Sequence, residues 1–200
     1  MSTGKIVALV VGVLLVLTVW SGYNGLVSQD ENVNSAWSET QNQLKRRNEL
    51  IPNLVSTVQG YAAHERGVFT EVAEARAKVA QAVKIDAAQL AASPALQKQL
   101  LGAQQSLNAS LGRLIAVAEN YPQLKASENF MGLQHELAGT ENRITVARGR
   151  AIKATQEYNK SIRTFPTIVV ARLGGFDHKA YYEATEAEQK TPVVNFGKKS

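Results

Sequence analysis

Cysteine is absent from this chain of 200 residues, and aromatic residues make up only 6% of it. The lack of cysteine excludes disulfides, zinc–thiolate sites, iron–sulfur clusters, thiol nucleophiles and lipid anchoring through an N-terminal cysteine. Few aromatics beside a hydrophobic content of 44% are typical of long helices rather than of sheets. A chain of this length forms one domain, with or without a tail.

Concentrated charge is also missing. The net charge of +5 is spread along the chain, and its densest basic run is Lys45-Arg46-Arg47. Binding to nucleic acid requires a basic stripe beside aromatic residues or a known binding fold. Neither occurs here, so the sequence argues against a nucleic-acid partner.

Catalytic and metal-binding motifs are incomplete or missing. His64-Glu65 and His135-Glu136 each begin like the helix of a zinc protease, but Val68 and Gly139 stand where the second histidine would be. The chain has no Walker loop, dinucleotide-binding fingerprint or Gly-x-Ser-x-Gly elbow. We therefore predict no enzyme activity, no cofactor and no metal.

The chain has one long hydrophobic run, from Ile6 to Trp20, with Thr18 inside it. As a helix, residues 6–23 would rise about 27 Å, close to the hydrocarbon thickness of a bilayer. Trp20 and Tyr23 fall where aromatic residues of a membrane interface are expected. The run lacks a polar face, which argues against a helix buried in a soluble core. We therefore predict a transmembrane anchor.

The charges beside this run predict its orientation. Lys5 precedes the run, and the next basic residue is Lys45. The positive-inside rule then places the N-terminus in the cytoplasm and the body outside it. A cleaved signal peptide is the alternative, but Val19-Trp20-Ser21 is a poor cleavage site. We favour an uncleaved, single-pass anchor in the cell membrane.

Apolar residues repeat every seven positions through the rest of the chain, which predicts long helices. The repeated rows are Trp37, Leu44, Ile51 and Val58, with Val33, Leu54, Tyr61 and Val68 beside them; Leu100, Leu107, Leu114 and Tyr121; and Phe130, Leu137, Ile144, Ala151, Tyr158 and Phe165. A row of mostly small residues beside the last one would let a neighbouring helix approach closely. The predicted fold is all-α: an N-terminal transmembrane helix followed by an elongated antiparallel bundle of long, coiled-coil-like helices.

Proline and serine positions predict where these helices begin and end. Residues 24–83 would be about 90 Å long as one helix, which Pro52 would bend rather than end. Ser93-Pro94 predicts a helix start, Ser127 can cap another, and Pro166 ends the last pattern. The predicted divisions are residues 1–23, the cytoplasmic stub and anchor; residues 24–166, the helical bundle; and residues 167–200, a C-terminal tail in which 192–196 look extended.

One group of polar residues interrupts the apolar rows. The candidate interaction residues are Arg47, Asn53, Glu141, Arg143 and Arg148. We hypothesise that Arg47, or Asn53 beside the proline, faces Glu141 and fixes the register of the bundle, as buried polar residues can. The alternative is that Glu141 and Arg143 point to solvent.

Several strings in combination resemble the LemA family over nearly the whole body of the chain. They include Tyr23-Asn24-Gly25-Leu26-Val27, Leu50-Ile51-Pro52-Asn53-Leu54-Val55, Gly60-Tyr61-Ala62-Ala63-His64-Glu65, Glu119-Asn120-Tyr121-Pro122-Gln123-Leu124, Thr140-Glu141-Asn142-Arg143-Ile144 and Phe165-Pro166. The resemblance implies a membrane-associated, elongated antiparallel helical bundle and does not imply an enzyme. It also implies membrane-associated partners such as TPM-domain proteins or zinc metallopeptidases.

Two departures from the family pattern stand out. Many members carry a lipobox cysteine just before the Tyr-Asn pair, whereas Ser21-Gly22 lead into Tyr23 here. The hydrophobic helix alone must therefore hold the chain in the membrane. Members also often repeat a Tyr-Asn pair one helical step before Tyr158-Asn159, where this chain has Ala151-Ile152.

These features favour a membrane-anchored, non-catalytic scaffold or interaction protein of the bacterial envelope, which binds membrane-associated partners or copies of itself. One alternative is an envelope stress or membrane-remodelling factor. Another is a ligand-binding module that uses the polar group. A deep pocket lined by Arg47, Glu141 and Arg143 would favour this module, whereas a solid apolar seam would not.

Overall fold

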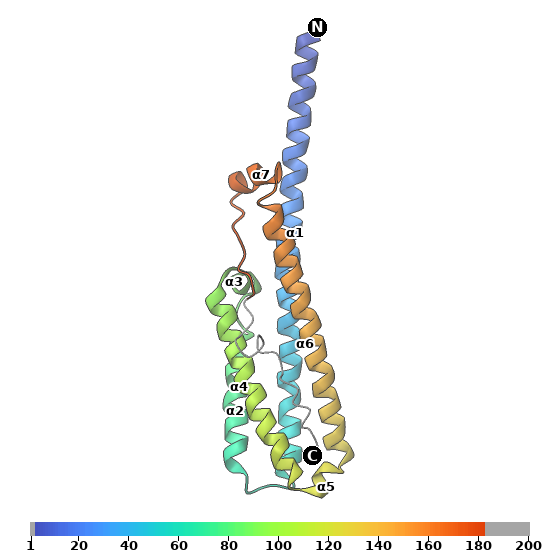
Figure 1. Ribbon diagram of the computed structural model, residues 1–200, viewed down its shortest axis with the longest axis vertical. Helices are drawn as coiled ribbons and strands as arrows, with labels where there is room; N and C mark the ends of the chain where they lie inside the picture. Colours follow the sequence, from blue (N-terminus) through green and yellow to red (C-terminus); the bar gives the residue numbers. More distant parts are fainter. Residues whose placement is uncertain (1–2, 183–200) are drawn as a thin grey trace, which may run out of the picture.

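The computed structural model describes residues 3–182, in which we find seven helices and no strand. The helices are α1 (Thr3–Gln59), α2 (Arg66–Ala82), α3 (Ala87–Ala92), α4 (Pro94–Glu119), α5 (Pro122–Lys125), α6 (Glu128–Ser161) and α7 (Thr167–Gly174). The four long helices α1, α2, α4 and α6 form an elongated antiparallel bundle, and α1 extends beyond it alone (Figure 1). The predicted all-α fold is confirmed.

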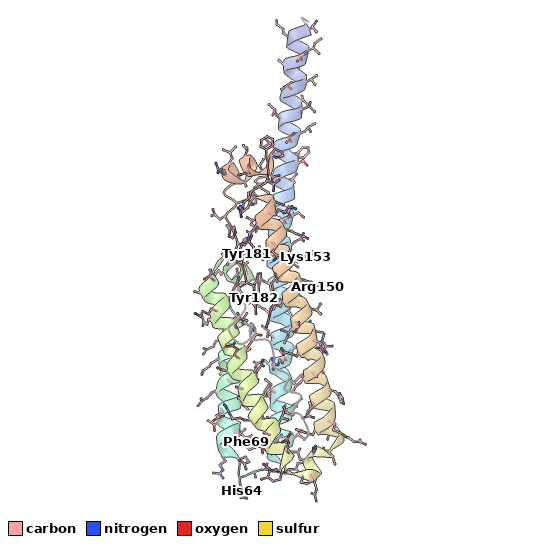
Figure 2. The ribbon with its side chains drawn as sticks, viewed as in Figure 1. His64, Phe69, Arg150, Lys153, Tyr181 and Tyr182 are labelled. Carbon is pink, nitrogen blue, oxygen red and sulfur yellow. The ribbon has the colours of Figure 1, made fainter. Side chains whose placement is uncertain are left out.

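α1 is a single helix of 57 residues. It continues through Pro52, as predicted, and it does not break at Gly22 or Gly25. Residues 3–21 are exposed on all sides, and their side chains stand clear of the bundle (Figure 2). Among the described helices, α1 alone is long and apolar enough to cross a membrane, and none of the apolar segment that could do so is buried.

The core of the bundle follows the predicted rows of seven. The row from Trp37 to Val58 on α1 is at most 3% exposed. Nearly complete burial also holds for Leu100, Leu107 and Leu114 of α4 and for Ile144, Ala151 and Tyr158 of α6. Each buried Leu or Ile stabilises the fold by about 1.5–3 kcal/mol. The small residues Thr140 and Ala147 are buried as well, on the helix that packs most closely along α1.

Residues 24–83 are two helices, not the single long helix considered from the sequence. α1 ends at Gln59, residues 60–65 turn, and α2 runs back beside α1 (Figure 1). Tyr61, predicted to lie on a buried row, sits in this turn and is 45% exposed. A seven-residue repeat shows which positions are buried but not which way the chain runs. The apolar pattern therefore continues from α1 into α2 although the chain reverses between them.

The predicted helix starts and stops are partly correct. Ser93 caps α4, because its Oγ accepts a hydrogen bond from the Leu96 N–H at 3.3 Å. Ser127 precedes α6 but makes no capping hydrogen bond through its side chain. α6 ends at Ser161, and Phe165, predicted to continue its buried row, is 80% exposed.

The segment after α7 is tied to α6 and α1. The Asn159 side chain pairs with the backbone of Lys179: its Nδ2 donates to the carbonyl and its Oδ1 accepts from the N–H, both at 2.9 Å. The Tyr158 hydroxyl donates to the Asp177 carbonyl at 2.9 Å. Lys179 Nζ lies 2.8 Å from Oδ1 of Asp30 on α1. The described part of the predicted tail therefore packs on the bundle, while residues 192–196 lie outside the described residues.

Burial, aided by the negative charges of Asp30 and Asp177, raises the pKa of Tyr158 to about 12. An unfolded tyrosine titrates near pH 10, so between about pH 10 and 12 the unfolded state binds fewer protons and stability falls as pH rises.

Tyr158→Phe removes this titration together with the hydroxyl. We expect the variant to be less stable by about 1 kcal/mol near neutral pH, because it lacks one hydrogen bond. The difference from the wild type should shrink as pH rises above about 10. Urea unfolding in detergent, followed by circular dichroism at several pH values, measures this difference. A difference that stays constant with pH would contradict the expected titration.

Candidate functional site

Arg47 is the centre of the polar group predicted from the sequence. α1 places it at a core position, where it is 7% exposed. Its Nη1 lies 2.8 Å from Oε2 of Glu141 on α6, and its Nη2 donates to Oδ1 of Asn108 on α4 at 2.5 Å. One side chain thus links three of the four long helices. We call Arg47, Asn108 and Glu141 the polar crossing.

The electrostatics of the crossing depend on burial. Burial lowers the pKa of Arg47 and is the largest effect on it. The Glu141 carboxylate raises this pKa, and the positive charge of Arg148 lowers it further. A guanidinium nevertheless stays charged at neutral pH. A buried charge is costly unless it is paired, so Arg47 depends on its two partners. The Glu141 side chain is 44% exposed, which weakens the attraction but spares it full desolvation.

The other predicted residues lie outside the crossing. Asn53 is exposed on α1, so Arg47 rather than Asn53 faces Glu141. Arg143 is also exposed, and its Nη2 donates to Oγ1 of Thr140 at 3.3 Å. Arg148 lies nearer the C-terminal end of α6, where it donates to the side-chain oxygens of Gln104 at 2.8 Å and Tyr182 at 3.2 Å.

A groove of about 410 Å³ opens beside the crossing, between α4 and α6. It exists because α4 packs mainly on α2, whereas α6 packs mainly on α1. Arg47 and Glu141 contribute to its lining, and its apolar walls come from Leu111, Ile115, Leu137 and Ala138. We call this the α4–α6 groove.

A second groove, of about 300 Å³, is lined by residues of α1 and α6, among them Glu39, Arg143 and Arg150. A single ligand-binding pocket would be lined by Arg47, Glu141 and Arg143 together, but these residues line two different grooves. Arg143 belongs to the second groove, whereas Arg47 and Glu141 belong to the first. Among residues 3–182, no group of three or more His, Asp or Glu side chains is placed to hold a metal ion.

Sequence reasoning missed the polar residues of α4. Gln97 and Gln104 are 3% and 5% exposed, and they stand seven residues apart. Gln41 and Asn48 of α1 show the same spacing and are also buried. A seven-residue row of amides beside an apolar row was therefore the signal that could have identified Gln104 as a buried polar residue.

The sequence model of the LemA family matches residues 36–196. The chain belongs to the LemA family. Magnetosome protein MamQ of Magnetospirillum gryphiswaldense is 26% identical over 196 residues, which cover 91% of this chain and 72% of that protein. Magnetosome protein MamQ 2 of Paramagnetospirillum magneticum matches to the same extent. Protein LemA of Metamycoplasma hominis is 25% identical over 173 residues, or 86% of this chain and 74% of that protein.

None of these names states an enzyme activity. Family membership and the exposed apolar segment of α1 together indicate a membrane-associated protein. The geometry adds that the buried Arg47 forms an ion pair with Glu141 beside an apolar groove.

The polar crossing predicts energetic coupling between Arg47 and Glu141. Glu141→Gln leaves the buried guanidinium without its counter-charge, so we expect a loss of about 1–2 kcal/mol of unfolding free energy. In an Arg47→Met background the same change should cost only a few tenths of a kcal/mol, a coupling of about 1 kcal/mol. Urea unfolding in detergent measures all four proteins of this cycle.

Glu136→Gln is the matched control on the same helix. Its partner Arg46 lies 3.7 Å away, and both side chains are about half exposed. We expect this change to alter stability by less than about 0.5 kcal/mol, because exposed ion pairs contribute little. Absence of coupling in the cycle would show that the crossing does not hold the helices in register.

Proposed function

We propose that this protein is a membrane-anchored, non-catalytic scaffold of the bacterial envelope that holds a membrane-associated partner protein beside the bilayer. The observation that carries this proposal is the continuity of α1, which supplies both the exposed apolar segment and the spine of the bundle. A rod attached in this way presents its side surfaces at fixed distances from the membrane. From residue 24 to residue 59, α1 rises about 54 Å.

The α4–α6 groove is the partner surface in this proposal. Its lining is mostly apolar, Ile115 is 36% exposed there, and Arg47 and Glu141 neutralise each other beside it. Such a groove suits the apolar face of a helix, a common mode of protein recognition. The family resemblance favours a TPM-domain or metallopeptidase-like protein as the partner. A second copy of this chain is the competing occupant.

The two alternative functions receive unequal support. An envelope stress or membrane-remodelling factor would need the same anchor and bundle, so the geometry does not separate it from a scaffold. The ligand-binding module is less favoured, because Arg143 and the pair of Arg47 and Glu141 line different grooves.

Photocrosslinking in native membranes tests the partner surface. A photoreactive amino acid replaces Ala138 in the groove or, as the matched control, Ala77 on α2; both alanines are exposed. We expect Ala138 to yield a crosslink to an integral membrane protein, identified by mass spectrometry, and Ala77 not to yield it. The same replacement at Ile115 should capture the same protein.

Other products would contradict the proposal in distinct ways. Identical products at Ala138 and Ala77, or none at either, would show that the groove does not select a partner. A crosslink between two copies of the chain would identify the groove as a homo-oligomer interface. A crosslink within one chain would show that the protein covers its own groove.

The proposed topology places the N-terminus in the cytoplasm and the bundle outside it. Because the chain has no cysteine, single-cysteine variants report one position each. In spheroplasts, we expect a membrane-impermeant maleimide to label His64→Cys, at the far end of the bundle (Figure 2), but not Thr3→Cys until the membrane is permeabilised. The reverse pattern would invert the topology, and the cysteine-free parent controls for background labelling.

A further inference from the structure

α7 packs against α1 at the level where the apolar run ends. A Cβ added to Gly22 would lie 3.3 Å from Cγ2 of Val170, so the two helices meet closely there. The ring of Phe176 meets the ring of Tyr23 edge-on, with centroids 5.5 Å apart. Gly175, with φ of 70°, ends α7 in the left-handed conformation that glycine tolerates best. α7 is therefore held where α1 leaves the bundle, to one side of it (Figure 1).

The face of α7 turned away from the bundle is apolar and exposed. Val170 and Ala171 are buried, whereas Val169 is 49% exposed and Leu173 is 82% exposed. Val169 and Leu173 are four residues apart and therefore share one face of the helix. Together with Phe165, at the corner just before α7, they form what we call the α7 patch. Leu173 and Phe165 are the most exposed large hydrophobic side chains among residues 3–182.

The surroundings of the α7 patch carry positive charge. Residues 160–176 contain three basic side chains and no acidic one: Lys160, Arg163 and Arg172, all exposed. On α1, no charged residue occurs between Lys5 and Asp30. The Asp30 carboxylate is paired with Lys179, and Asp177 follows α7 without balancing the three basic residues.

We propose that the α7 patch binds the surface of the bilayer that α1 spans. Val169, Leu173 and Phe165 would enter the boundary between headgroups and acyl chains, and the arginines would contact anionic headgroups. A lipid surface is the occupant because the patch lies on a helix held at the level where the exposed apolar segment of α1 ends: Val170 of α7 meets Gly22, within one helical turn of Trp20. An interfacial helix of this kind is buried about 5–10 Å into that boundary.

This inference rests on the proposed anchoring by α1 and adds a second point of contact. A single spanning helix can tilt in the bilayer, because its tilt is set by its neighbours and its interfacial residues. α7 supports the rod on one side of α1 only. With both contacts made, the rod has a fixed tilt, and the α4–α6 groove faces one direction relative to the membrane.

Depth-dependent fluorescence quenching tests the inference on the full-length chain. The protein is reconstituted into vesicles of phosphatidylcholine with phosphatidylglycerol, with an environment-sensitive fluorophore on Leu173→Cys, Val13→Cys or Lys78→Cys. All three positions are exposed, so the labels do not disturb packing. Spin-labelled lipids act as quenchers near the headgroup or near the chain end. We expect the shallow quencher to act most on Leu173→Cys, the deep quencher most on Val13→Cys, and neither on Lys78→Cys.

The controls separate this inference from the proposed function. If Leu173→Cys behaves like Lys78→Cys while Val13→Cys is quenched, α7 does not touch the bilayer but α1 still spans it. If Val13→Cys is not quenched, anchoring by α1 is itself wrong. If Leu173→Cys is protected from maleimide in native membranes but not in vesicles, the patch binds a protein instead of lipid.

A charge variant tests the basic side chains. In the Leu173→Cys background, Arg163→Gln combined with Arg172→Gln should reduce shallow quenching, and so should vesicles of phosphatidylcholine alone. Arg150→Gln, an exposed arginine in the middle of α6, is the matched control and should leave the quenching unchanged. Equal quenching in both kinds of vesicle and in the double variant would overturn the role of Arg163 and Arg172.

Discussion

The whole structure depends on α1, which passes from one environment into another without a break. Up to Ser21 every residue of α1 that the structure describes is exposed, and from Leu26 onward one side of the helix faces the core. A flexible joint at Gly22 or Gly25 would have separated the bundle from its anchor. The helix instead continues through both, and Val170 of α7 packs against Gly22. Because α6 packs along α1 for most of its length, the orientation of the bundle follows from that of α1.

The buried polar contacts are consistent with our hypothesis that polar side chains select one alignment of the other helices along α1. Apolar rows that repeat every seven residues can shift by one repeat and still meet apolar neighbours. A shift at Arg47 would instead leave a buried charge without Glu141 and Asn108, at a cost of several kcal/mol. Gln41 acts similarly, since its Nε2 donates to the Ile85 carbonyl at 2.7 Å and so positions the connection before α3. In this hypothesis apolar burial supplies stability, and the polar contacts supply register.

The sequence predicted the helices and the Arg47–Glu141 contact better than it predicted the chain path and the remaining site residues. Periodicity reports which positions are buried, so the α1 row was correct, but it did not reveal the reversal at Gly60. The sequence suggests one polar group that contains both Arg143 and Glu141, but residues two apart on a helix point to different sides. The pairing of Asn159 with Lys179 could not be predicted from the sequence. Asn159 bonds to the backbone of Lys179, and a backbone contact leaves no pattern in the side chains.

The two exposed surfaces of the rod differ in chemistry, and the different partners that we propose for them follow from this difference. Around the α7 patch the charges are basic and unbalanced within residues 160–176, so attraction to an anionic surface adds to apolar burial. At the α4–α6 groove, Arg47 and Glu141 are the only charged residues of 3–182 in the lining, and they already neutralise each other. A partner there gains little from charge and must match the shape of the apolar walls. The membrane end therefore favours lipid, and the groove favours a protein helix.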